Sequence, residues 1–133
     1  MKKGFTLIEL LAVIVILAII ALIATPIILG IINDAREEAE VRTAELVASS
    51  VELAYTGYLF DHEGNKPAAL CDFMTDDYFA MDGATQTCAS ETSTVTVGED
   101  TYTVTFDGAQ ATVKGGTNVH AGLEAINVKL ATN

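Results

Sequence analysis

The chain has 133 residues, of which 50% are hydrophobic, and a formal net charge of −11 at pH 7. Its length fits one domain of ordinary size. Proteins that bind nucleic acid directly usually carry a basic patch that replaces counterions on the phosphates, and this sequence shows no such patch. We therefore expect no direct nucleic-acid binding.

The sequence also lacks a recognisable catalytic constellation. It contains no G-x-S-x-G motif, no phosphate-binding loop and no C-x-x-C pair, and its two histidines, His62 and His120, lie far apart in the chain. We therefore expect neither an enzyme nor a cofactor site.

The hydrophobic residues are concentrated near the N-terminus, where the run from Leu10 to Ile32 contains no charged side chain. A membrane span needs about 20 predominantly apolar residues, so this run is long enough to cross a bilayer. Lys2 and Lys3 precede the run and several acidic residues follow it. By the positive-inside rule, this charge distribution keeps the N-terminus in the cytoplasm and exports the rest of the chain.

Three kinds of segment could explain this run. A secretory signal peptide would have a shorter apolar core followed by a small-residue cleavage site, which the sequence does not show. A plain membrane anchor fits the length but gains nothing from Glu9, because a charged side chain at membrane depth costs about 2.5–3.5 kcal/mol. The third possibility is a helix that must find a partner for Glu9.

Residues 2–10, Lys-Lys-Gly-Phe-Thr-Leu-Ile-Glu-Leu, resemble the processing motif of the type IV pilin family. In that family a prepilin peptidase cuts after the glycine and then methylates the new N-terminal residue. The resemblance implies a leader at residues 1–4, cleavage between Gly4 and Phe5, and N-methylation of Phe5. It also implies that Glu9 pairs with the N-terminal amine of a neighbouring subunit. Burial of unpaired charges would penalise any other register.

The resemblance covers about residues 2–36 and departs from the family pattern at one position. Pro26 matches a proline that the family commonly carries, whereas Ala18 stands where many members have glycine. Alanine is the best helix former, so melting of the helix from Ala18 onward is less favoured. Pro26 removes a backbone donor and clashes one turn back. We therefore expect a kink or local unwinding near Thr25 and Pro26.

After Ile32 the sequence becomes amphipathic, and we expect an extracellular globular domain over residues 33–133. Apolar residues at three- and four-residue spacing in residues 33–58 predict the second half of one helix from about Thr6 to Tyr58. The stripe expected to face the core consists of Val41, Ala44, Ala48, Val51, Tyr55 and Tyr58. The glutamates expected largely on other faces are Glu37, Glu38, Glu40, Glu45 and Glu52.

Residues 59–92 are predicted to be an irregular loop region that contains both cysteines of the chain, Cys71 and Cys88. In an exported domain these two residues allow one disulfide, typically worth about 2–4 kcal/mol, and two free buried thiols are the alternative. Four aspartates in this region could ligate calcium, although they lack EF-hand spacing, and a solvated acidic loop is the simpler interpretation. These aspartates are Asp72, Asp76, Asp77 and Asp82. We therefore expect no metal site.

Alternation of apolar and polar residues over residues 93–133 predicts three half-buried strands and a fourth near the C-terminus. The expected fold class is therefore α+β. A long N-terminal helix, with its apolar half projecting, would pack on an antiparallel sheet of three to four strands.

The resemblance implies a structural subunit of a type IV pilus, a helical homopolymer that supports adhesion or twitching motility. Residues 5–32 would first hold a single-pass precursor in the cytoplasmic (inner) membrane and would later form the core of an extracellular surface filament. The expected partners are other copies of the chain, prepilin peptidase, and the assembly platform with its ATPase. A pseudopilin of a type II secretion or competence DNA-uptake system is the first alternative. A monomeric membrane-anchored binding module is the second, and Glu9 argues against it.

Overall fold

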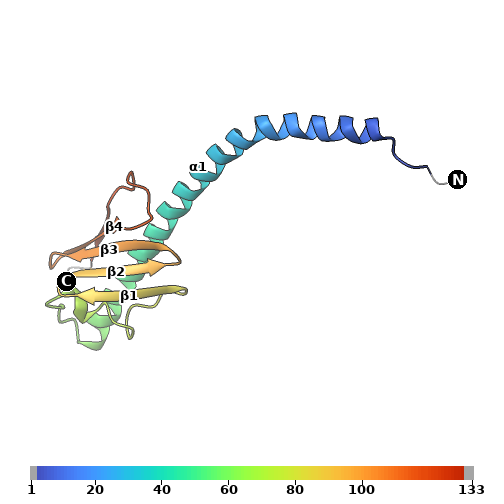
Figure 1. The fold of residues 1–133 in the computed structure, drawn as a ribbon. Coiled ribbons are helices and arrows are strands. Elements are labelled where there is room, and N and C mark those ends of the chain that lie inside the picture. The colour runs from blue at the N-terminus through green and yellow to red at the C-terminus, as the bar shows by residue number, and fades with distance from the viewer. Residues whose placement is uncertain (1–2, 131–133) are drawn as a thin grey trace. The chain divides into compact units, whose positions relative to one another are not determined.

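The computed structural model describes residues 3–130, and the chain divides into two compact units. The N-terminal unit is Met1–Arg36 and the C-terminal unit is Glu37–Asn133. One helix, α1, runs from Leu7 to Asp61 and contributes to both units (Figure 1). Met1 and Lys2 of the expected leader lie outside the described residues, as do the last three residues of the predicted sheet region.

The remaining elements all belong to the C-terminal unit. They are the short 3-10 helix η1 (Leu70–Asp72) and the strands β1 (Ala84–Ala89), β2 (Thr92–Val97), β3 (Asp100–Phe106), β4 (Gln110–Gly115) and β5 (Ile126–Lys129). The strands form one antiparallel sheet in the order β1-β2-β3-β4-β5, so each strand pairs with the next one along the chain. The predicted α+β class is therefore confirmed.

The turns between the first four strands are short. Residues 90–91 join β1 to β2, and residues 98–99 join β2 to β3. Gly98 has a φ of 64°, a left-handed conformation that glycine adopts without steric cost. In the turn from β3 to β4, the Asp107 carboxylate accepts hydrogen bonds from the backbone N–H groups of Ala109 and Gln110, at 3.0 and 2.7 Å.

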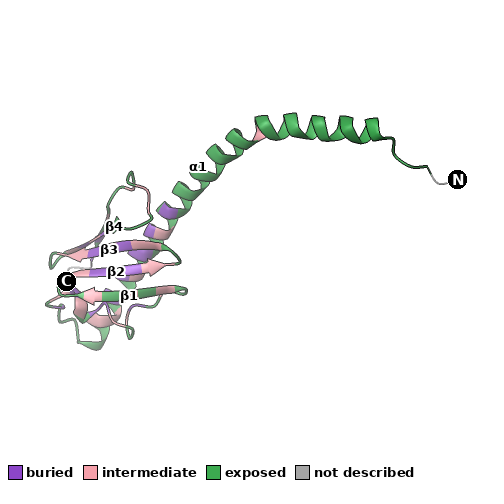
Figure 2. Ribbon diagram, viewed as in Figure 1, coloured by how far each residue is buried: buried purple, intermediate pink, exposed green. Residues whose placement is uncertain are grey.

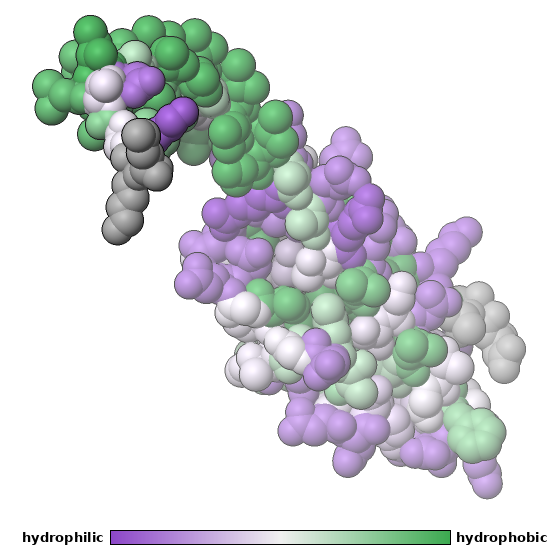
Figure 3. Space-filling model, turned by 90° about the vertical axis from the view of Figure 1, so that its right-hand side faces the viewer, coloured by the Kyte–Doolittle hydropathy of each residue, from purple (hydrophilic) through white to green (hydrophobic). Residues whose placement is uncertain are grey.

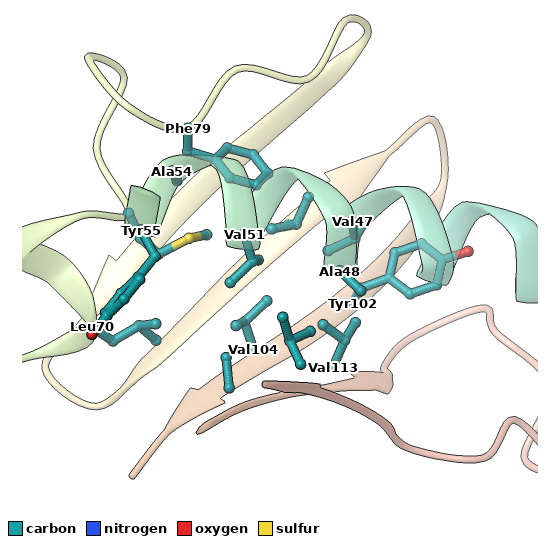
Figure 4. Close-up of a cluster of buried hydrophobic side chains, with 14 of the residues drawn as sticks. Val47, Ala48, Val51, Ala54, Tyr55, Leu70, Phe79, Tyr102, Val104 and Val113 are labelled. Atoms are coloured by element: carbon teal, nitrogen blue, oxygen red, sulfur yellow. The ribbon is translucent and has the colours of Figure 1, made fainter. Parts of the chain in front are cut away.

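The hydrophobic core lies between the second half of α1 and the inward face of the sheet (Figure 4). The helix contributes Ala44, Val47, Ala48, Val51, Ala54 and Tyr55, and the sheet contributes Val95, Tyr102, Val104, Ala111, Val113 and Val128. Phe73 closes one end of this core and makes edge-to-face contacts with Tyr55 and Phe106, with ring centroids 5.3 and 5.4 Å apart. Aromatic pairs in this geometry add stability beyond the area that they bury.

The sheet has five strands rather than the predicted three or four. The additional strand is β1, which lies in the region predicted to be a loop. Its sequence, ATQTCA, has no large apolar residue, and its inward-facing side chains are only half-buried. Pairing with β2 and the disulfide at Cys88 position this strand, and neither can be deduced from hydrophobic periodicity.

The prediction of which helix residues face the core is confirmed except at the two ends of the stripe. Ala44, Ala48, Val51 and Tyr55 are buried and Tyr58 is half-buried. Val41, however, is 37% exposed, and Glu40 is buried in its place, with 3% exposure. The position of Glu40 was predicted wrongly because its partner lies in a distant loop, as described below.

Candidate assembly site

The segment that precedes α1 is exposed and non-helical. Residues 3–6 have no regular secondary structure, and the side chain of Phe5 is 92% exposed. A β-carbon added at Gly4 would meet no other atom within 4 Å. The peptide bond between Gly4 and Phe5, where cleavage is expected, therefore lies in an extended and uncrowded stretch.

Glu9 lies in the first turn of α1 and forms hydrogen bonds with Thr6. Its Oε2 atom accepts hydrogen bonds from the backbone N–H and the hydroxyl of Thr6, both at 2.9 Å. The backbone N–H of Glu9 in turn donates to the Thr6 hydroxyl at 3.3 Å. This reciprocal arrangement is a capping box, which satisfies donors that a helix N-terminus otherwise leaves without partners. This local partner of Glu9 was not predicted from the sequence, although the Thr-x-x-Glu spacing is typical of a capping box.

The first half of α1 presents apolar side chains on every face. No residue from 3 to 39 is buried, and large aliphatic side chains such as Leu17 and Leu22 are 58% and 78% exposed (Figure 2). Figure 3 shows the N-terminal part of the helix as a mostly hydrophobic surface with a few polar residues near its end. By length and composition, α1 is able to cross a membrane.

The helix is unbroken through Thr25 and Pro26. The local unwinding expected there is therefore absent from the single subunit. Pro26 supplies no backbone donor to the carbonyl of Leu22, but the hydroxyl of Thr25 donates to the carbonyl of Ala21 at 2.6 Å and adds a contact in the same turn. The long helical runs on both sides hold this turn in place, because helix formation is cooperative. A kink at Pro26 stays a prediction.

The two cysteines form a disulfide between Cys71 in η1 and Cys88 in β1, with their Cα atoms 5.7 Å apart. The two cysteines are 17 residues apart in the sequence. The bond fastens the connecting segment between α1 and the sheet to one edge of the sheet.

A buried acidic residue joins α1 to the loop between β4 and β5. The Oε2 atom of Glu40 accepts hydrogen bonds from the backbone N–H of His120 at 2.9 Å, and lies 2.6 Å from His120 Nδ1. The Tyr102 hydroxyl donates to the backbone carbonyl of Glu40 at 3.3 Å, and burial raises the pKa of this hydroxyl. The histidine is 80 residues from the glutamate, so no local motif identifies this pair.

The acidic loop is not arranged around a common point. Among the described residues, no three His, Cys, Asp or Glu side chains come together to hold a metal ion. The Asp72 carboxylate accepts hydrogen bonds from the backbone N–H groups of Ala68 and Ala69, both at 2.8 Å. Asp76 and Asp82 line an open hollow beside β1.

Comparison with protein families gives one match, to the family described as the prokaryotic N-terminal methylation motif, over residues 1–25. Comparisons with curated proteins and with solved structures give no significant match. The matched residues contain the Gly4–Phe5 bond, the capping box and most of the apolar run.

Proposed function

Because it carries this N-terminal methylation motif, the chain is a type IV pilin-like prepilin, and on that premise we propose that it is the structural subunit of a type IV pilus. We propose that the precursor is cut after Gly4 and methylated at Phe5 by prepilin peptidase. The mature subunit then leaves the cytoplasmic membrane and polymerises into a surface filament through an assembly platform and its ATPase. Adhesion or twitching motility is a property of that polymer, and the subunit itself is not an enzyme.

One observation carries this proposal: Glu9 directly precedes the uncharged run Leu10–Ile32 of α1, in which no side chain is buried. A lipid-embedded anchor needs only the apolar surface. A filament core needs that surface together with a charge that selects the stagger between neighbouring helices, because a wrong stagger buries a charge without a partner. Glu9 provides such a charge, and cleavage would create the complementary amine on Phe5.

The test compares Glu9→Ala with Glu45→Ala, which removes an exposed acid from the second half of the same helix. Mass spectrometry of the mature N-terminus should find Phe5 cleaved and methylated in both variants. Electron microscopy of sheared surface material should find filaments for Glu45→Ala and few or none for Glu9→Ala. Wild-type filament yield from Glu9→Ala would refute the proposed charge pairing.

The same micrographs separate the pilus from its alternative. Long surface filaments that contain this chain support a pilus. Only short assemblies despite high expression would support the pseudopilin of a secretion or DNA-uptake system. Chains that never crosslink to one another would support the monomeric binding module.

A further inference from the structure

The sheet of the C-terminal unit ends in two edge strands, β1 and β5, because each of them pairs with only one neighbour. An edge strand directs a row of backbone N–H and C=O groups away from the sheet, and these groups can pair with a strand from another molecule. Proteins commonly hinder such pairing with a short edge strand, or with lysine or proline on the edge. The two edges of this sheet differ in these features.

The β5 edge is protected and the β1 edge is not. β5 has four residues and carries Lys129. β1 has six residues, ATQTCA, with no charged residue and no proline. Its two threonines suit an extended conformation. β1 is therefore the edge that is open to a further strand.

The backbone of β1 offers hydrogen-bonding groups on its open side. Residues 90–91 form a two-residue turn between β1 and β2, and hydrogen-bonded pairs alternate with non-hydrogen-bonded pairs from that turn onward. The N–H and C=O groups of Ala84, Gln86 and Cys88 therefore face away from β2. The Ala84 N–H donates to the carbonyl of Met81 at 3.2 Å, which agrees with this register. Gln86 is thus the central position for an added strand.

A hollow of about 690 Å³ lies beside the same edge, and Gln86 is part of its lining. The apolar part of the lining consists of Phe79, Ala80, Met81 and Ala84. Side chains of a strand alternate between two faces, so every second side chain of an added strand would meet this apolar wall. The inward side chains of β1 are only half-buried, and an added strand would cover them as well.

The charge around the hollow indicates what kind of segment fits. Asp76 and Asp82 line it, and both are exposed. A second copy of the chain, with its formal charge of −11, would bring further acidic residues to the same junction. A segment with a basic side chain would instead complement the two carboxylates, and such complementarity gives an interface its specificity.

We propose that the free edge of β1 binds an extended segment of a different protein, which adds a strand to the sheet and places a lysine or arginine beside Asp76 and Asp82. In this mode of recognition, main-chain hydrogen bonds supply affinity, and pockets for alternate side chains supply specificity. The site lies within the C-terminal unit, so it does not depend on the proposed filament function.

Synthetic peptides test the inference on the full chain in detergent micelles. The probe is a fluorescent peptide of about eight residues, within the usual length of a strand, with alternating valine and threonine and a lysine at each end. Fluorescence anisotropy should give a dissociation constant below about one millimolar. The same peptide with two prolines lacks two backbone donors and should bind much more weakly. Equal binding of the two peptides, or no binding of the lysine peptide at that concentration, would overturn the inference.

A pair of double variants tests the role of charge. Asp76→Asn with Asp82→Asn removes both carboxylates and should weaken binding of the lysine peptide about fivefold. Glu45→Gln with Glu52→Gln makes the same change in net charge at a hollow beside β5 and should change binding less than about twofold. Thermal unfolding should be similar in both, because these four side chains are exposed. Equal weakening in both double variants would overturn the assignment to β1.

Hydrogen exchange measured by NMR locates the bound peptide. The amide of Gln86 should exchange more slowly when the lysine peptide is bound, while exchange in β5 stays unchanged. Protection confined to β5 would overturn the inference. A dimer of the chain joined through β1 in the absence of peptide would also overturn it, because the occupant would then be a second copy.

Discussion

The two halves of α1 have the same backbone conformation but differ in what surrounds their apolar side chains. In the N-terminal unit none of the described residues is buried. In the C-terminal unit seven residues of the same helix are buried, and six of them contact the sheet or the elements that close the core. The second half is thus stabilised by its own chain. The first half exposes its apolar side chains and is covered by nothing in its own unit, and on the proposed function lipid would surround it before assembly and neighbouring helices afterwards.

Core substitution should separate the two halves most strongly. Tyr55→Ala removes a fully buried aromatic side chain and should lower the free energy of unfolding by about 3–5 kcal/mol. Leu17→Ala removes an exposed side chain and should leave the unfolding of the detergent-solubilised subunit nearly unchanged while reducing filament formation. Thermal unfolding of both variants, paired with filament counts, checks this. Similar losses of stability in Tyr55→Ala and Leu17→Ala would contradict the view that only the second half of α1 is stabilised by its own chain.

Removal of the disulfide should be the next largest effect, and it should be confined to the C-terminal unit. Cys71→Ser with Cys88→Ser should destabilise that unit by about 2–4 kcal/mol. Denaturant unfolding of wild-type protein under reducing conditions should give the same loss. The double variant should be insensitive to the reductant, which provides the control. Cleavage of the leader should be unaffected.

The Glu40–His120 pair should contribute less than the disulfide. His120→Ala removes the imidazole but keeps the backbone N–H that donates to Glu40, so we expect a loss of about 1–3 kcal/mol. His62→Ala, which removes an exposed histidine, is the matched control. A double-mutant cycle with Glu40→Ala measures the coupling, and additive losses would show that the two side chains do not stabilise each other.

Within the N-terminal unit, the capping box should have a modest and local effect. Thr6→Ala should weaken the first turn of α1 by about 1 kcal/mol, because it removes the hydroxyl that bonds to Glu9. Hydrogen exchange of the full chain in micelles should be faster in that turn and unchanged in the sheet. Thr6→Ser retains the hydroxyl and should behave like the wild type. Equal exchange in both variants would show that the box does not stabilise the turn.

The smallest effect should come from the turn between β3 and β4. Backbone N–H groups of Ala109 and Gln110 hold the pKa of Asp107 below its ordinary value of 3.8. A carboxylate with a lowered folded-state pKa stabilises the fold above its unfolded pKa, and this contribution disappears as the pH falls through the folded value. At neutral pH the wild type should therefore be slightly more stable to unfolding than Asp107→Asn. This difference should disappear as the pH is lowered below about 4. A difference that stays constant down to about pH 2 would contradict this assignment.

The sequence predicted the fold where periodicity was strong. The apolar run, the amphipathic half of α1 and the strands rich in valine and threonine each carry a clear spacing, and the structure has the corresponding elements. The strand β1 was missed because small and polar residues give no period-two signal, and its pairing with β2 decides its conformation. Glu38 and Arg42 form an exposed ion pair four residues apart on the helix, a contact that depends on local spacing alone.

The residues of the candidate site also differ in whether a local sequence pattern indicates them. Gly4, Phe5 and Glu9 lie close together in the sequence and are proposed from the motif, whereas the burial of Glu40 depends on a loop 80 residues away. Leu46, Leu53 and Phe60 are exposed but recur every seven residues as core residues can, so periodicity alone cannot tell which side of the helix meets the sheet. Only the packed structure distinguishes the two sides.

The capping box at Glu9 has a consequence for the energetics of assembly. Because Thr6 already donates two hydrogen bonds to the Glu9 carboxylate, a neighbouring amine would replace existing donors rather than meet a bare charge. Such an exchange changes the number of hydrogen bonds little, so its net free energy is small compared with that of burying the apolar helix surface. The carboxylate would thus select the stagger between neighbouring helices, while burial of the apolar surface would supply most of the free energy of assembly. On the proposed function, such a polymer would come apart where lipid again covers that surface.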